Sequence, residues 1–468
     1  MRRIALLFLA AISVASAAAA ATRPHYGGTL RVAMQSAPNA LVLPAGSDPA
    51  NYWDVARVLS LVGDTLVRVD AEDRVQSGLA IGWQHDATAR HWQFVVRRGI
   101  KFQDGSLASP AAIAQILGAL HPNWTVRSTA GAAFPAMTSG GSTTDSARDS
   151  LTIDTDAPAP SMLAELAMPR NLILAHNLGG IPIGTGPFRV TDFQPGRQLK
   201  LAASDESWAG RPFVDAVEIE FGKSLRDQAL ALDLGRADMV EATPEAATSS
   251  TRSRVSSSLR IELMALVFTP NTRVQDARVR EALALSIDRK PIQFVLLKGA
   301  GEPTASILPN WMTGYSAAFS TQPNVARAKT LLAEARAPAL TLSYDARDPQ
   351  AQLIAERIAL NAHEAGIMLQ VSLSGSEDVR LVRIALATPD PALALREAAR
   401  ELSLAEPVVR GNSVEELYQA EHGLLEGNTV IPLFHVPVAS AAGGRVRGWS
   451  AGRLGLWDVA GIWLEDAR

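Results

Sequence analysis

Apolar and polar residues alternate with a period of two along much of the first half of the chain, which is the pattern of half-buried β-strands. Trp92, Phe94 and Val96 show this period in "HWQFVV", and "LTIDTD" and "FRVTDFQPGRQLKLAAS" repeat it further on. After the first of these strands, Ser109 and Pro110 supply an N-cap and a first helical residue. The pattern predicts strands joined by turns, with a helix that begins after Ser109.

Two stretches of this half lack a clear period. Residues 123–150 have the weakest pattern, and their glycine-rich part, "MTSGGSTTDSARDS", predicts a surface loop between strands. Residues 243–258 are rich in serine and threonine, and they predict a loop or a loosely packed helix.

From about residue 268 the pattern changes to an alternation of helices and strands. Val279, Ala282, Leu283, Ser286 and Ile287 fall on one face of a helix, which is the spacing of an amphipathic helix that packs on a core. Further helices are predicted at 324–335 and 348–366, and strands at 339–345 and 367–375. This order indicates an α/β lobe, and "TVIPLFHVPVASAA" predicts a buried strand that carries the chain back to the first lobe.

Composition places the chain among exported soluble proteins. Its 468 residues are enough for two or three lobes, and 47% hydrophobic with 19% charged residues is ordinary for a globular protein. Residues 1–21 begin with Arg2 and Arg3, continue with a short apolar run and end in small residues, which is typical of a signal peptide; the alternative is a retained membrane anchor. The absence of cysteine excludes disulfides and a lipid-modified cysteine. The mildly acidic, well-mixed charges disfavour nucleic acid as a ligand.

Motifs of catalysis and metal binding are weak in this sequence. "GWSAG" places Ser450 at the centre of a nucleophile-elbow match, but the last histidine, His435, precedes it, so a hydrolase is disfavoured and a surface turn is expected. No two of the eight histidines have the i, i+4 spacing of a helical metal site. "IPIGTGPFRV" lacks the lysine of a P-loop, and Arg189 stands where the third glycine of a dinucleotide-binding loop belongs. We expect Gly184 and Gly186 to act as backbone joints instead.

Tryptophans suggest where a ligand would bind. Trp83 and Trp92 sit in alternating strand patterns and are expected in the core, whereas Trp53 and Trp311 lie in polar, loop-like contexts. Aromatic side chains on loops at a lobe junction are typical of ligand clefts, but packing on the surface explains them equally well. Both interpretations stay open for each of the two residues.

Several ordered motifs resemble those of the family 5 extracellular solute-binding proteins, the peptide and nickel binders of ABC importers. They are "YGGTLRVAM", "DTLVRVDAEDRVQSGLAIGWQHDATARHWQFVVRRGIKFQDGSLAS", "IPIGTGPFRVTDFQPGRQLKLAASDESWAG", "NTRVQDARVREALALSIDRKPI" and "NVARAKTLLAEA". The resemblance implies a bilobal α/β clamp of the type II periplasmic-binding-protein class, with an extra inserted subdomain. It assigns 22–45, 184–267 and 436–468 to lobe I, 46–183 to the inserted subdomain and 268–435 to lobe II.

The chain departs from the peptide-binding relatives where they hold the peptide's amino group. Their "W..D..DP" segment is matched by "RIALATPDP", in which Ile384 stands near the place of the tryptophan and Ala387 near that of the aspartate. A buried carboxylate is a strong anchor for an ammonium, so its loss disfavours ordinary free-amine peptides. The segment between Ser372 and Ser413 is also short, which predicts a trimmed second lobe.

The function that the resemblance implies is that of a periplasmic receptor, which captures a small solute, peptide-like or other, and delivers it to an ABC permease. It would be a monomer without catalytic residues, cofactor, metal or bound nucleic acid, and it would not insert in the membrane after its signal peptide is removed. The alternative is a secreted sensor or chaperone-like module with the same fold. The residues expected to bind ligand, from the resemblance and from their loop or hinge context, are Asn51, Tyr52, Trp53, Asn271, Trp311, Tyr315 and His435.

Overall fold

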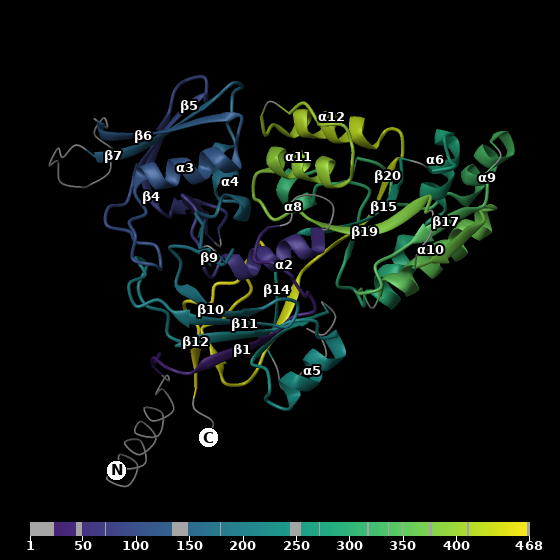
Figure 1. Ribbon diagram of the computed structural model, residues 1–468. Coiled ribbons are helices and arrows are strands. Elements are labelled where there is room, and N and C mark those ends of the chain that lie inside the picture. Colours follow the sequence, from purple (N-terminus) through teal and green to yellow (C-terminus); the bar gives the residue numbers. More distant parts are fainter. Residues whose placement is uncertain are drawn as a thin grey trace, which may run out of the picture.

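The computed structural model describes most of the chain after the first 22 residues. The described residues are 23–43, 49–70, 72–132, 148–177, 179–243, 254–270, 272–315, 318–335, 337–348, 350–373, 377–409 and 411–465. The expected signal peptide at 1–21 lies outside them. Two lobes and a subdomain next to the first lobe make up the rest (Figure 1).

The first lobe is built around a seven-stranded sheet in the lower part of Figure 1. Strand β1 pairs in parallel with β12 and β13, whereas the other neighbours in the sheet are antiparallel. Leu30, Val217 and Ile219 of these strands are fully buried and form the lobe's core together with one side of helix α2 (Pro49–Leu59). In sheet order the strands are β10 (Phe188–Gln194), β11 (Gln198–Ala203), β12 (Ala216–Glu220), β1 (Thr29–Ala33), β13 (Met239–Ala242), β21 (Ala439–Ala442) and β14 (Arg254–Ser257).

The inserted subdomain carries a four-stranded antiparallel sheet, seen above the first lobe in Figure 1. Its strands, in sheet order, are β4 (Ala80–His85), β5 (His91–Val96), β7 (Arg148–Thr155) and β6 (Trp124–Ala132). Helices α3 (Pro110–Leu120) and α4 (Met162–Leu166) pack beside it, and the side chain of Ser109 caps α3 as predicted. β6 occupies the first part of the weakly patterned stretch; its Trp124 and Val126 pack against the core, to which β7 supplies the fully buried Leu151 and Ile153. The part of the predicted loop at 137–147 lies outside the described residues.

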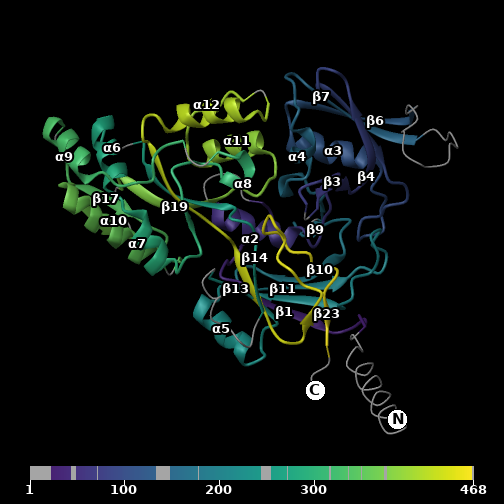
Figure 2. The same cartoon turned by 180° about the vertical axis from the view of Figure 1, so that it is seen from behind.

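The second lobe has a six-stranded sheet with helices on both faces, as Figures 1 and 2 show from opposite sides. Leu263 and Val267 of the central strand β15 pack with α11 and α12, whereas Met264 and Leu266 pack with α6 and α10. In sheet order the strands are β16 (Glu302–Pro303), β20 (Val430–Val436), β15 (Glu262–Phe268), β19 (Val379–Ala385), β17 (Leu340–Ser343) and β18 (Leu369–Ser372). The helices are α6 (Ala277–Ser286), α7 (Arg289–Pro291), η3 (Ile292–Leu296), α8 (Asn310–Thr313), α9 (Val325–Glu334), α10 (Ala351–Ala365), α11 (Pro391–Glu401) and α12 (Val414–Leu425).

Two short segments connect the sheets of the two lobes. Residues 258–261 join β14 to β15, and residues 437–438 join β20 to β21. Ser258 N donates to Val438 O at 2.9 Å, and Val438 N donates to Ser258 Oγ at 3.0 Å, so the two crossings lie side by side. Paired crossings of this kind form a hinge about which two lobes can close.

The sheets move two of the predicted boundaries. The prediction places residues 184–267 in the first lobe, but β15 pairs with β19 and β20 of the second sheet, so the change of lobe falls near residue 261. It also assigns α2 to the inserted subdomain, whereas α2 packs in the first lobe's core.

The glycines of "IPIGTGPFRV" lie against the turn that follows α2. A Cβ on Gly184 would be 2.1 Å from Val62 O, and one on Gly186 would be 2.7 Å from the same oxygen. Gly186 N donates to Val62 O at 2.8 Å, and Gln103 Nε2 donates to Val62 O at 2.9 Å and to Phe188 O at 2.7 Å. The backbone at Gly184 and Gly186 therefore packs directly against the turn after α2, as expected for backbone joints without side chains. Strand β10 follows the glycines as predicted.

Short elements complete the fold. They are β2 (Val67–Val69), β3 (Val75–Ser77), η1 (Pro169–Asn171), β8 (Ala175–His176), β9 (Pro182–Ile183), α5 (Leu225–Asp233), β22 (Val446–Arg447) and β23 (Trp463–Leu464). β14 lies within the stretch at 243–258 that the serine-rich pattern assigned to a loop or a helix; it is an edge strand that pairs only with β21. Within the described ranges, no helix is both long and apolar enough to cross a membrane.

Candidate functional site

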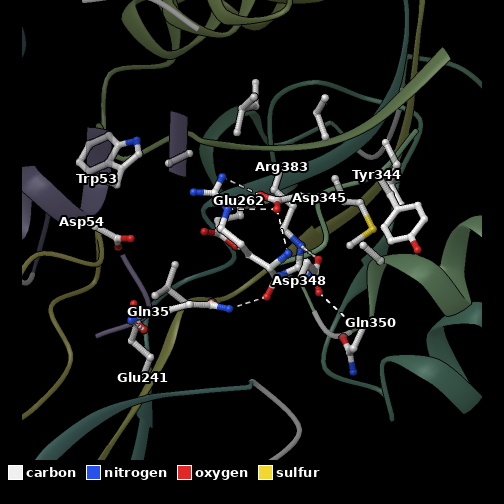
Figure 3. Close-up of a pocket in the computed structure, with 18 of the residues that line it drawn as sticks. Gln35, Trp53, Asp54, Glu241, Glu262, Tyr344, Asp345, Asp348, Gln350 and Arg383 are labelled. Carbon is white, nitrogen blue, oxygen red and sulfur yellow. Dashed lines mark hydrogen bonds and ion pairs between the residues drawn. The ribbon is translucent and has the colours of Figure 1, made fainter. Parts of the chain in front are cut away.

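A cavity of about 590 Å³ lies between the two lobes, beside the crossing segments. Helix α2 and the ends of β1 and β13 form its first-lobe side, and β15, β19 and the loop after β17 form its second-lobe side. This volume falls in the range of sites for small molecules and short peptides. Figure 3 shows its side chains, among them Gln35, Trp53, Asp54 and Glu241 of the first lobe and Glu262 and Arg383 of the second.

Helix α2 places an aromatic side chain and two charged ones at the cavity. Val55, Val58 and Leu59 bind the helix to the first lobe's core, which directs Trp53 and Asp54 towards the second lobe. The ring of Trp53 packs in an apolar cluster with Ile261, Ala387 and Leu393, so this cluster spans both lobes.

Asp54 is a half-buried carboxyl with one close cationic partner. Arg57 Nη1 lies 2.6 Å from Asp54 Oδ1, and Arg57 Nε donates to Gly455 O at 3.0 Å. Burial raises the pKa of Asp54 to about 7; Arg57 opposes this rise, while the carboxylates of Glu241 and Glu262 add to it. Near neutral pH the site therefore holds a carboxyl that can gain or lose a proton.

Glu241 and Glu262 face this carboxyl from two strands in different lobes. Glu241 accepts hydrogen bonds from Gln35 N at 2.6 Å and Gln228 Nε2 at 2.8 Å, both of which are neutral donors. Glu262 lies 3.7 Å from Arg383 Nη1. Burial raises the pKa of Glu262 as well, with Arg383 acting in the opposite direction.

The second-lobe wall carries an ordered set of ion pairs. Arg383 Nε lies 2.9 Å from Asp348 Oδ2, and Arg347 Nη2 lies 2.8 Å from Asp345 Oδ2. Gln35 Nε2 donates to Arg347 O at 2.7 Å, so a hydrogen bond crosses the cleft from the first lobe. Of these contacts, the hydrogen bond from Gln35 joins the two walls of the cavity, and the ion pairs order the second-lobe wall.

Glu401, at the end of α11, also lines the cavity. Its Oε2 is buried and has no hydrogen-bond partner among the described residues. Burial raises the pKa of Glu401 to about 8, and the neighbouring Glu397 raises it further.

The structure places one of the seven predicted ligand residues, Trp53, in the lining of the cavity. Tyr52 precedes it on α2 and packs edge-on against its ring at 5.4 Å, but does not line the cavity. Burial raises the pKa of Tyr52 to about 12. Asn51 lies in the first turn of α2 with a side chain outside the described set, and Asn271 lies outside the described residues.

Of the other three predicted residues, His435 and Tyr315 form bonds within the second lobe, whereas Trp311 packs against the cluster around Trp53 that spans both lobes. His435 is buried in β20 and its Nε2 donates to Ile307 O at 2.9 Å. Tyr315 donates to the carboxylate of Glu421, and burial raises the pKa of that carboxyl to about 7. Trp311 Nε1 donates to Arg260 O at 3.2 Å. None of the three lines the described cavity.

Sequence reasoning missed the charged residues of the cleft. A usable signal was present, because Glu262 begins the otherwise apolar strand "ELMALVF" and Glu241 interrupts "MVEA". Arg380 and Arg383 likewise interrupt "VRLVRIA" in β19. Charged residues inside buried strands are rare unless they are paired or functional.

The "GWSAG" motif does not form a nucleophile elbow in the structure. Ser450 is exposed and follows no strand-to-helix turn, which fits the surface turn expected for "GWSAG". Among the described residues, no group of three or more His, Cys, Asp or Glu side chains is placed to hold a metal ion.

Comparison with known proteins identifies the family. The model of the bacterial extracellular solute-binding proteins, family 5, matches residues 74–386. The chain belongs to this family. Its α/β bilobal fold, predicted from the sequence, is confirmed by the same comparison and by solved structures.

The relatives of this family 5 protein are distant. The nickel-binding protein NikA of Staphylococcus aureus is 24% identical over 235 residues, which cover 47% of this chain and 48% of NikA. The probable ABC transporter periplasmic-binding protein SapA of Escherichia coli is 27% identical over 203 residues, which cover 41% of this chain and 37% of SapA. The chain thus spans about half or less of the length of the curated relatives that it matches.

Solved structures match the whole fold. NikA of Staphylococcus aureus in complex with Ni(L-His)2 has a TM-score of 0.76 at 17% identity and covers 93% of this chain and 100% of NikA. AgaA of Agrobacterium in complex with agropinic acid has a TM-score of 0.76 at 18% identity, with 94% and 99% of the two chains covered. At this identity the likeness concerns the fold.

Proposed function

We propose that this family 5 protein is a periplasmic receptor that captures a small solute, peptide-like or other, between its lobes and delivers it to an ABC permease. The observation that carries the proposal is the cavity of about 590 Å³, which is lined by both lobes and lies at the paired crossings of the hinge. A ligand held there contacts both lobes only when they are closed, so its binding energy favours closure.

The same proposal covers the protein's other properties. It acts as a monomer without catalysis, cofactor or resident metal, and it is exported by residues 1–21 rather than anchored through a lipid. Of the predicted ligand residues, Trp53 lines the cavity, which supports its proposed role in binding the solute. Asn51 and Asn271 remain proposed ligand residues, and we propose that Tyr52, Trp311, Tyr315 and His435 shape the walls from behind.

A thermal-shift screen tests the proposal. Purified protein is mixed with peptides, sugars, opines and nickel chelates, and a true ligand raises the melting temperature by mass action. Small-angle X-ray scattering with the same compound then shows whether the radius of gyration decreases, as closure of the lobes requires. The control is Trp53→Ala, which should weaken the response to that compound. If no class of solute raises the melting temperature, the receptor function is wrong.

A pull-down from membranes separates transport from the alternative. Recovery of an ABC permease by the liganded protein supports the importer, whereas recovery of a sensor kinase alone favours the sensor with the same fold. Both outcomes require the ligand found in the screen, because delivery follows closure.

A further inference from the structure

The charged groups of the cavity do not balance. Six acidic residues line it, Asp54, Glu241, Glu262, Asp345, Asp348 and Glu401, against four arginines, Arg57, Arg347, Arg380 and Arg383. Asp345 and Asp348 have close arginine partners on their own wall. The excess negative charge falls on the remaining carboxylates. Because burial raises the pKa of Asp54 to about 7 and that of Glu401 to about 8, this excess grows as the pH rises through this range, and it attracts a positively charged solute.

Three of these carboxylates reach the cavity from three different elements. Asp54 comes from α2, Glu241 from β13 and Glu262 from the first residue of β15. In Figure 3 Asp54 and Glu241 lie on the left, below Trp53, and Glu262 lies nearer the centre, beside Arg383. We call Asp54, Glu241 and Glu262 the carboxylate triad. Two of its members belong to the first lobe and one to the second, so a solute that contacts all three bridges the two lobes.

Arginine side chains of the protein neutralise the carboxylate triad only in part. Glu241 forms no ion pair with any described residue and accepts hydrogen bonds only from neutral donors. Glu262 shares Arg383 with Asp348, which lies closer, at 2.9 Å against 3.7 Å. Asp54 alone has a close arginine, Arg57. The triad can thus accept another positive charge without displacing an existing close pair.

A buried donor beside the triad independently indicates a ligand. Trp53 lines the cavity and is only 7% exposed, yet its Nε1 has no hydrogen-bond partner among the described residues. In Figure 3 this nitrogen lies on the edge of the indole that faces the other pocket side chains. An indole N–H can only donate, and a buried donor without an acceptor is costly. An acceptor atom on the solute would satisfy it after a shift of the indole or its neighbours, because the nitrogen itself is buried.

The triad suits an organic cation better than a metal ion. Among the described residues no cluster of acidic and histidine side chains is close enough to coordinate a metal. An ammonium or guanidinium group carries several N–H donors that point in different directions, so it can reach carboxylates on separate elements. At the position where the peptide-binding relatives would carry an aspartate, Ala387 is buried in the apolar cluster around Trp53.

We propose that Asp54, Glu241 and Glu262 bind an ammonium or guanidinium group of the solute, while Trp53 donates to a carbonyl or hydroxyl oxygen of the same molecule. This inference rests on the proposed receptor function and adds the chemical class of the substrate. The anchor for a positive charge thus stands on α2, β13 and β15, away from the segment around Ala387.

Matched probes test the inference by calorimetry and thermal shift. Nα-acetyl-lysinamide carries one ammonium and two carbonyl acceptors, and Nα-acetyl-norleucinamide has a similar chain without the charge. Both are measured with the broader solute screen and with the anionic Nα-acetyl-glutamate. We expect the ammonium compound, and cationic members of the screen, to bind at least about tenfold more tightly than their neutral counterparts.

Two variants locate the charge that matters. Glu262→Gln leaves Arg383 paired with Asp348, and Asp54→Asn removes a second member of the triad. Each should weaken binding of the cationic probe by about tenfold or more. Asp205→Asn, at an exposed carboxylate outside the cavity, is the control. Melting temperatures without probe show that each variant is folded.

The outcomes separate this inference from the receptor function. Binding of cationic compounds that both triad variants weaken supports it. If the solutes that bind are neutral or anionic, or if cationic ones bind both variants as tightly as the unchanged protein, the inference is wrong and the receptor function stands. If no compound of any class binds, both are wrong.

Discussion

Arg170 and Glu397 form a two-armed ion pair that joins the inserted subdomain to the second lobe. Arg170 Nη1 lies 2.8 Å from Glu397 Oε2, and Nη2 lies 3.1 Å from Glu397 Oε1. Arg170 lies shortly after α4, and its Nε donates to Glu165 Oε1 of that helix at 2.7 Å. Glu397 lies on α11. The guanidinium of Arg170 therefore lies between a carboxylate of the inserted subdomain and one of the second lobe. The side chains of Arg170 and Glu397 are both mostly buried.

The first prediction concerns this pair as a latch on the closed cleft. Glu397→Gln removes the charge on the second-lobe side and leaves Arg170 paired with Glu165, so no buried cation is orphaned. We expect the closed form to lose about 1–2 kcal/mol, which weakens the binding of any captured solute about 5- to 30-fold without unfolding the protein. Calorimetry measures the affinity, and scattering measures the radius of gyration.

A surface pair supplies the matched control for the latch. Glu206→Gln breaks the ion pair with Lys101, whose atoms lie 2.9 Å apart, but this pair is exposed and does not span the cleft. It should leave affinity unchanged. Equal affinities for the unchanged protein and Glu397→Gln would show that the pair plays no part in closure.

The second prediction concerns the glycine joint at Val62. Gly184→Ala places a Cβ 2.1 Å from Val62 O, and backbone atoms cannot move aside as a flexible side chain can. We expect a loss of about 3 kcal/mol or more in the free energy of unfolding. Gly118→Ala is the control: it lies inside α3 with open space around it, so alanine should stabilise the helix by up to about 1 kcal/mol. Urea denaturation measures both, and similar stabilities would contradict the close approach.

Local pattern was enough to predict the elements that carry their own signal. The alternation around Phe94 and the cap at Ser109 gave β5 and α3, and "GTGP" gave the joint before β10. The edge strands β6 and β14 were missed for two different reasons. The partner of β6 is β7, which carries the fully buried apolar residues of the pair, and the partner of β14 is β21, which is distant in the sequence.

The candidate site depends even more on distant partners. Glu241 is recognisable as a site residue only once Gln35, about 200 positions earlier, lies against it. For His435, the predicted position at the hinge gives no sign of the buried hydrogen bond to Ile307 O, whose residue is distant in the sequence. Sequence context located the cleft only through Trp53. Which other side chains line the cleft depends on tertiary packing, which the sequence pattern does not reveal.

The third prediction follows from the burial of His435. Burial lowers its pKa from 6.5 to about 4, so the folded protein keeps the ring neutral while the unfolded chain takes up a proton below pH 6.5. Stability that is present above pH 6.5 is therefore lost as the pH falls towards 4, by about 3 kcal/mol in total. In His435→Gln this loss should be absent, whatever its stability at pH 7. His176→Gln, at an exposed histidine, should keep the wild-type pH dependence. Urea unfolding at pH 7 and 4.5 makes the comparison.

The fourth prediction is that a cationic solute binds more tightly as the pH rises. Asp54 faces Arg57, Glu241, Glu262 and Arg347, and its burial raises its pKa to about 7, with Arg57 opposing the rise. Below pH 7 the free site therefore carries a proton on Asp54 that a bound ammonium must displace. Affinity for Nα-acetyl-lysinamide should fall by up to about tenfold for each unit between pH 7 and 5.5, since one pKa unit corresponds to about 1.4 kcal/mol.

Calorimetry can measure both the trend and its cause. In buffers with different ionisation enthalpies, binding at pH 6 should release about one proton, because a positive charge beside Asp54 lowers the pKa of that carboxyl again. At pH 8.5 Asp54 is already ionised, so binding of the solute should release almost no protons. Asp54→Asn has no proton to release, and its weaker affinity should vary little with pH over this range. An affinity that rises on acidification, or a proton release that Asp54→Asn retains, would show that Asp54 does not face the bound cation.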